Sequence, residues 1–140
     1  MTQESVNQIW QATQRGDMFA ATILGILFYE GKIVKQDVSN AIMLLNRAAE
    51  SNVLWAQNLM MYINGVPHND YELTRNALAM TDAVEQLEQH AYSNEFAAAA
   101  VSEIYLRGTS FVNDLNKATH FLNISSQKGC LYAKELLHTR

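Results

Sequence analysis

The sequence from Ala20 to Ala41 reads AATILGILFYEGKIVKQDVSNA, and a related stretch, AAAAVSEIYLRGTSFVNDLNKA, runs from Ala97 to Ala118. The two stretches lie 77 residues apart and carry small, apolar, glycine and aspartate residues at matching positions. Self-similarity at a fixed spacing is typical of repeat architectures, in which each unit buries its apolar face only against its neighbours. The sequence therefore predicts an array that presents a shaped surface rather than a catalytic pocket.

The first stretch has the pattern of two helices separated by a glycine. Apolar residues over 20–28 recur three and four residues apart, which places them on one helical face. Gly31 suits the left-handed conformation that ends a helix. A second helix is expected to begin near Asp37, whose carboxylate can cap free backbone amides, and to end near Asn52. In the later stretch, Asp114 and Gly129 stand at the corresponding start and stop.

The middle of the chain is less regular. A first helix is predicted over 56–63, with a stop at Gly65 followed by the only proline, Pro67. Asp70 is expected to cap the next helix, whose apolar stripe continues past the usual length to Ala91. The units therefore differ in length.

The prediction is an all-α fold: a short α-solenoid of antiparallel helix hairpins, with about eight helices in a single domain. The first residues resemble the second helix of an incomplete unit, and the last ones a lone first helix. Half-units at both ends would cover the terminal faces of the array. The expected units are 17–52, 53–93 and 94–129, with half-unit caps 1–16 and 130–140.

Residues 20–52 and 97–129 resemble the Sel-one-like repeat, a relative of the tetratricopeptide repeat. The family pattern is roughly A-x(3)-L-G-x(2)-Y-x(2)-G-x-G-V-x(2)-D-x(2)-K-A-x(2)-W-x(3)-A-A-x(2)-G. The matching residues include Leu24, Gly25, Gly31, Asp37 and Ala41 in the first stretch and Tyr105, Gly108, Asp114, Ala118 and Gly129 in the second. The chain departs from the pattern at Ile33, at Asn52 and at the Ser125-Ser126 pair.

The resemblance implies a right-handed superhelical array whose first helices line a concave side. Repeats of this kind are typically protein-binding scaffolds, and bacterial members include virulence adaptors, signalling scaffolds and immunity proteins that neutralise toxins. The resemblance therefore predicts a protein partner.

Composition narrows the class of partner and the compartment. The 140 residues carry a net charge of −4, whereas nucleic-acid binding requires clustered Lys and Arg. No apolar run approaches the length of a membrane span. The first residues show no cationic segment followed by an apolar core, and a single cysteine fits a reducing compartment. We therefore expect a cytoplasmic protein that binds neither nucleic acid nor membrane.

The sequence offers no diagnostic catalytic or metal motif. The four histidines stand outside any His-Glu-x-x-His or Cys-x-x-Cys context, and the glycines are spaced by helices rather than clustered around a phosphate. We expect no metal, no cofactor and no enzyme activity, with Cys130 as a packing residue. An enzyme would need a deep cleft that collects His90, Glu95 and Cys130.

One candidate binding surface is an acidic stretch. Asp82, Glu85 and Glu88 lie three residues apart on the long second helix, within a segment, 76–106, that has no Lys or Arg. They are predicted to fan over the face opposite the apolar stripe. They form either a solvated outer face or a patch that steers a basic partner.

A second candidate surface lies on the first helices. Ile23, Tyr29 and Leu106 are apolar at positions where the family pattern is commonly polar. Tyrosine, tryptophan and arginine carry much interface energy, and several such residues are expected nearby. The further candidates are Trp55, Tyr62, Glu103 and Arg107. The alternative for Ile23 and Trp55 is core packing, and core packing is also expected for Trp10.

The preferred hypothesis is a non-enzymatic binding module, and more specifically a bacterial immunity or antitoxin-like protein. Its expected partner is a basic toxin domain such as a nuclease, whose active site it would occlude. The alternative is an adaptor or regulatory scaffold that binds a peptide or helix in its concave groove.

Overall fold

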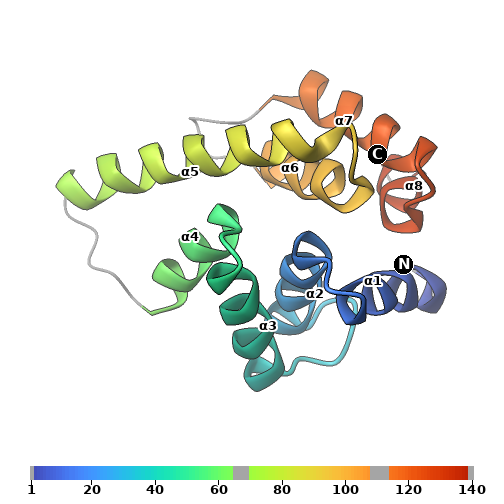
Figure 1. Cartoon of the computed structure of the whole chain (residues 1–140), viewed down its shortest axis with the longest axis horizontal. Coiled ribbons are helices and arrows are strands. Elements are labelled where there is room, and N and C mark those ends of the chain that lie inside the picture. Colours follow the sequence, from blue (N-terminus) through green and yellow to red (C-terminus); the bar gives the residue numbers. More distant parts are fainter. Residues whose placement is uncertain (1, 65–69, 108–113, 139–140) are drawn as a thin grey trace.

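A computed structural model describes residues 2–64, 70–107 and 114–138, and the side chains of 70–79 lie outside this description. Within these ranges all regular secondary structure is helical (Figure 1). The eight helices are α1 (Gln3–Gln14), α2 (Met18–Glu30), α3 (Val38–Glu50), α4 (Leu54–Ile63), α5 (Asp70–Ala91), α6 (Glu95–Arg107), α7 (Leu115–Gln127) and α8 (Leu131–His138). The predicted all-α fold is confirmed.

Aspartates set the starts of α2, α3 and α7. The Asp37 carboxylate accepts a hydrogen bond of 3.0 Å from the backbone N–H of Asn40, and Asp114 accepts one of 3.0 Å from Lys117. Asp17 caps α2 in the same way. Because a side-chain oxygen there satisfies N–H groups that have no partner within the helix, these aspartates fix where each helix begins. The predicted starts near Asp37 and Asp114 are confirmed.

Residues with positive φ set the stops. Gly31 (φ 66°) lies directly after α2, and Asn52 (φ 67°) and Gly129 (φ 100°) lie two residues beyond the ends of α3 and α7, as expected. A Cβ atom added at Gly31 would lie 2.5 Å from the Cβ of Gln36, so a side chain there would also meet steric conflict. The predicted features at Gly65, Pro67 and Gly108 fall outside the described residues.

Helices adjacent in sequence pack against each other as hairpins, with α2 on α3, α4 on α5 and α6 on α7. In the view of Figure 1, α1 to α4 form one layer and α5 to α8 the other. Gly25 permits the close approach of α2 and α3, because a Cβ there would lie 2.9 Å from the Leu45 side chain. The predicted helix hairpins are confirmed.

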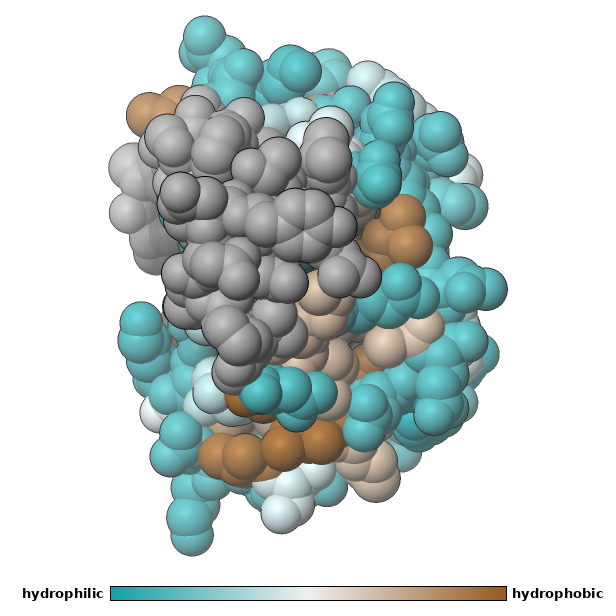
Figure 2. Space-filling model, turned by 90° about the vertical axis from the view of Figure 1, so that its left-hand side faces the viewer, coloured by the Kyte–Doolittle hydropathy of each residue, from teal (hydrophilic) through white to brown (hydrophobic). Residues whose placement is uncertain are grey.

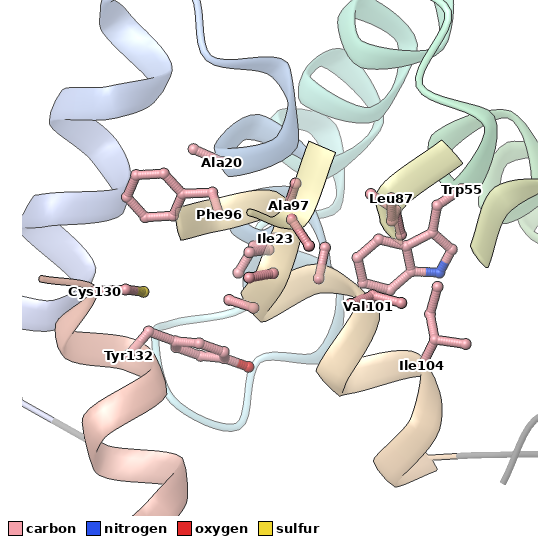
Figure 3. Packing of buried hydrophobic residues seen from close by; sticks show 14 of the residues in the cluster. Ala20, Ile23, Trp55, Leu87, Phe96, Ala97, Val101, Ile104, Cys130 and Tyr132 are labelled. Atoms are coloured by element: carbon pink, nitrogen blue, oxygen red, sulfur yellow. The ribbon is translucent and has the colours of Figure 1, made fainter. Parts of the chain in front are cut away.

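The core lies where α2 meets α6. Ala20 and Ile23 of α2 lie near Ala97 of α6 (Figure 3), and all four alanines over 97–100 are fully buried. Alanine side chains are short enough to let two helix backbones approach closely. Phe96 and Val101 complete the same cluster from α6.

The expectation that each unit packs only against its neighbours is wrong. Helix α2 of the first unit contacts α6 of the third, and α1 contacts α8. At the N-terminal ends of α2 and α6, the Asn94 amide donates to Asp17 over 3.1 Å. The alanine run explains this closure, because it lets α6 reach α2 directly. The middle hairpin, α4 and α5, lies to one side (Figure 1).

Candidate partner-binding groove

A groove of about 460 Å³ lies between α2, α4 and α6, with single contributions from α3 and α5. We call it the α2–α4–α6 groove. Its apolar lining comprises Ile26, Leu45, Trp55, Leu59, Ile63, Met80 and Ile104, and its polar or aromatic lining comprises Tyr29, Glu30, Asn58, Tyr62 and Arg107. The groove lies beside the contact between α2 and α6, with α4 packed mainly on α3 and α5.

The inner part of the groove is held in place by core residues. Trp55 of α4 is 3% exposed, and its indole lies among Leu87, Val101 and Ile104 (Figure 3). These contacts span α4, α5 and α6. Because Trp55 buries a large ring against rigid helices, this part of the groove is largely preformed.

Two tyrosines stand at the outer edge. Tyr29 is 39% exposed and Tyr62 is 71% exposed, and both line the α2–α4–α6 groove. Figure 2 shows apolar atoms reaching the surface beside the grey segment, on the side of the molecule where α4 and α5 lie. Exposed aromatic rings around an apolar depression are typical of binding surfaces rather than of a solvated exterior.

A network of charged residues closes one end of the groove. The Arg107 guanidinium donates two hydrogen bonds of 2.8 Å to the Glu30 carboxylate and one of 2.6 Å, from Nε, to Glu103. The Tyr132 hydroxyl donates to the other oxygen of Glu103. Glu103 is only 6% exposed, so these donors compensate for the burial of its charge. The network ties α2, α6 and α8 together.

The network also changes proton affinities. The hydrogen bond from Arg107 holds the pKa of the Glu30 carboxyl below its usual value of 4.5. The Glu30 carboxylate in turn raises the pKa of the Arg107 guanidinium. Burial, followed by the charge of Glu103, raises the pKa of the Tyr132 hydroxyl. All three groups therefore keep their usual charge states at neutral pH.

The structure brings together Tyr29, Trp55, Tyr62 and Arg107 of the predicted surface residues. It places Ile23 in the core between α2 and α6, at 2% exposure, and Glu103 inside the buried network. Burial favours the core-packing alternative for Ile23, and partner contact by either residue stays a prediction. Trp55 is a core residue with an edge in the groove. Leu106 is half-buried and lies outside the residues that line the groove.

The three acidic residues predicted to share one face of α5 differ in their exposure. Asp82 and Glu85 are exposed, whereas Glu88 is half-buried and accepts a hydrogen bond from the Tyr105 hydroxyl of α6. Burial, strengthened by this hydrogen bond, raises the pKa of Tyr105. Only two of the three predicted carboxylates are therefore exposed on this face, because Glu88 points toward α6.

Other side chains singled out in the sequence serve packing or lie elsewhere on the surface. The Cys130 thiol is fully buried, and burial raises its pKa. The His90 ring packs on Phe19 with 5.3 Å between centroids. Trp10, expected in the core, is 44% exposed and lines a second groove of about 540 Å³ beside α1 and α2. Neither groove is lined by His90, Glu95 or Cys130.

Among the described residues, no group of three or more His, Cys, Asp or Glu side chains could hold a metal ion. In the same part of the chain, no helix combines the length and apolar character that crossing a bilayer requires.

No protein-family model matches the chain, and no curated protein matches it. Two solved structures are similar to it. A Sel1 repeat protein from Oxalobacter formigenes shares 22% identity at a TM-score of 0.44, over 96% of this chain and 53% of that one. A protective antigen present in uropathogenic Escherichia coli strains, which displays an SLR fold, shares 20% identity at a TM-score of 0.41, over 89% of this chain and 26% of that one. This chain thus spans about half of the first structure and about a quarter of the second.

Proposed function

We propose that the chain is a non-enzymatic protein-binding module and that its partner inserts apolar side chains into the α2–α4–α6 groove. The observation that carries the proposal is an apolar depression, preformed around Trp55, with two exposed tyrosines and an arginine at its edge. Binding energy at protein interfaces concentrates on these residue types when they surround an apolar centre. A volume of about 460 Å³ accommodates several apolar side chains.

Arg107 is positioned to fix the orientation of the partner. Three of the five N–H groups of a guanidinium are used by Glu30 and Glu103, which hold its plane in one place. We propose that the remaining N–H groups donate to backbone carbonyls of the partner at the end of the groove. Because the guanidinium is already ordered, binding costs little side-chain entropy.

A photo-crosslinking residue placed at position 62 tests the proposal in the source cell. We expect it to capture one protein reproducibly, because Tyr62 is exposed at the groove. The matched control carries the same residue at position 92, since Tyr92 is also an exposed tyrosine (60%) but lies outside the groove. Equal capture from both positions would contradict the proposal.

We further propose an immunity or antitoxin-like role, in which the partner is a toxin domain. This role is supported by the net negative charge of the chain and by the exposure of Asp82 and Glu85. These carboxylates would attract a basic domain such as a nuclease. Co-expression with the protein encoded beside it should abolish that protein's toxicity and yield a 1:1 complex. Undiminished toxicity would refute this role and leave the groove proposal standing.

An adaptor that binds a peptide or helix is the alternative, and the groove itself favours it. An amphipathic helix places apolar side chains three and four residues apart, a spacing suited to a depression between three helices. Titration distinguishes the two roles. An adaptor should bind a peptide taken from the captured partner, whereas an immunity protein should bind only the folded domain.

A further inference from the structure

A glutamine of α1 binds the start of α8. The Gln8 side chain donates a hydrogen bond of 2.8 Å to the carbonyl of Gly129 and accepts one of 2.8 Å from the backbone N–H of Leu131. One amide thus satisfies both a carbonyl before the helix and an N–H group of its first turn. The contact joins the two ends of the chain.

The same contact occurs inside the middle unit. Gln86 of α5 donates to the carbonyl of Asn52 over 2.6 Å and accepts from the N–H of Leu54 over 2.8 Å, at the start of α4. Asn52 and Leu54 lie 77 residues before Gly129 and Leu131, at the matching positions of the repeat. Helix α1 therefore relates to α8 as α5 relates to α4.

It follows that the two ends of the chain build one further unit, with α8 as its first helix and α1 as its second. Additional contacts support this seam. The Thr2 hydroxyl donates to the Glu135 carboxylate over 2.7 Å, and the Thr2 N–H donates to it over 3.1 Å. The seam is the one place where the two helices of a unit are not covalently consecutive.

We propose that this α8–α1 seam is an exchangeable interface, and that its partner in trans is α1 of a second copy of this chain. Every contact of the seam can form with α1 from another molecule, which is the condition for domain swapping. Two copies that exchange α1 would each complete the other's unit and give a closed dimer. The proposal is independent of what the groove binds.

The hinge is the turn between α1 and α2. Gly16 has φ 92°, and the turn is closed by hydrogen bonds from Gly16 to Thr13 and from Asp17 to Ala12. A hinge glycine lets the chain fold back, whereas a residue that avoids positive φ favours a straight connection between the helices. The closed monomer predominates at low protein concentration, because the two ends are held at a high effective concentration.

Gly16→Ala tests the hinge. No atom lies within 4 Å of a Cβ added at Gly16, so the substitution acts on the backbone conformation and not on packing. After unfolding and refolding at high protein concentration, we expect the dimer fraction of Gly16→Ala to rise about fivefold over the unaltered chain, measured by light scattering after size separation. Gln11→Ala, an exposed control in α1, should match the unaltered chain. An unchanged, monomeric Gly16→Ala protein would overturn the proposal.

A disulfide test distinguishes exchange from surface association. A chain carrying Thr2→Cys is refolded together with one carrying Glu135→Cys, because only an exchanged seam brings these positions together in a mixed dimer. We expect mixed disulfide dimers to form about tenfold faster than with Lys134→Cys, which is exposed on the same helix. Equal rates for the two pairs would overturn the proposal even if dimers form.

Discussion

Arg107 and Glu30 stand at matching positions of two repeat copies, 77 residues apart, and bind each other through two hydrogen bonds of 2.8 Å. In an open array, matching positions of the first and third units would be separated by the unit between them. Their contact shows that the outer copies meet directly. The same contact closes one end of the α2–α4–α6 groove, so the closure of the array and the shape of its candidate site have a common origin.

Arg107→Met should destabilise the fold by about 2–4 kcal/mol, because it leaves the buried Glu103 carboxylate with only the Tyr132 hydroxyl. Chemical denaturation measures the loss. Adding Glu103→Gln to the same chain should restore part of the stability, since it removes the uncompensated charge. A double variant less stable than Arg107→Met would contradict this account.

Glu30 should make stability depend on acid pH. Its folded-state pKa lies below the usual 4.5, so its contribution is fully present above about pH 4.5 and is lost as the pH falls through the folded-state value. Glu30→Gln should therefore lower the free energy of unfolding at pH 7 and have a smaller effect at pH 3. Parallel profiles for Glu30→Gln and the unaltered chain would contradict the role of Glu30.

Gly31→Ala should cost more stability than Gly129→Ala. Both glycines have positive φ, which disfavours alanine by about 1 kcal/mol. At Gly31 the added Cβ also meets Gln36 at 2.5 Å, whereas nothing lies within 4 Å at Gly129. Thermal unfolding of the two variants gives the comparison. Equal losses would show that the turn after α2 relaxes freely.

The helix boundaries could be predicted because their causes are local. Asp37 and Asp114 cap amides three residues away, and Gly31 and Gly129 end helices through their own backbone conformation. Each signal lies within one turn of the boundary that it sets. Once the first and last residues of each helix are predicted, the pairing of consecutive helices into hairpins follows from their order in the chain.

The closure of the array could not be predicted in this way, because it depends on side chains far apart in sequence. The sequence nevertheless contains one indication of this contact, because the matching positions 30 and 107 carry residues of opposite charge. The alanine run over 97–100 was a second signal, since a helix without a polar face there must be buried on several sides. Both features agree with a direct contact between the first and third units.

The candidate site was only partly predictable. Tyr29, Tyr62 and Arg107 were expected near each other from their positions on the first helices, and all three line the groove. Their role in binding stays a prediction. Ile23 is buried in the core between α2 and α6, and Glu103 is buried where it binds Arg107 and Tyr132 of α8. Their positions in the sequence do not indicate these long-range contacts. Ile26, Leu59 and Ile63 were missed because a groove wall has the same apolar pattern as a core face.

The central claim is that a protein partner docks in the α2–α4–α6 groove, and the dissociation constants of groove variants test it most directly. The partner captured through position 62 is purified and titrated with chains carrying Tyr62→Ala, Leu59→Asp or the control Tyr92→Ala, each first shown to retain its helix content. We expect the two groove variants to weaken binding by at least about tenfold, as for truncation of an interface anchor. The control should stay within about twofold of the unaltered chain. Equal dissociation constants for all the variants would contradict the claim.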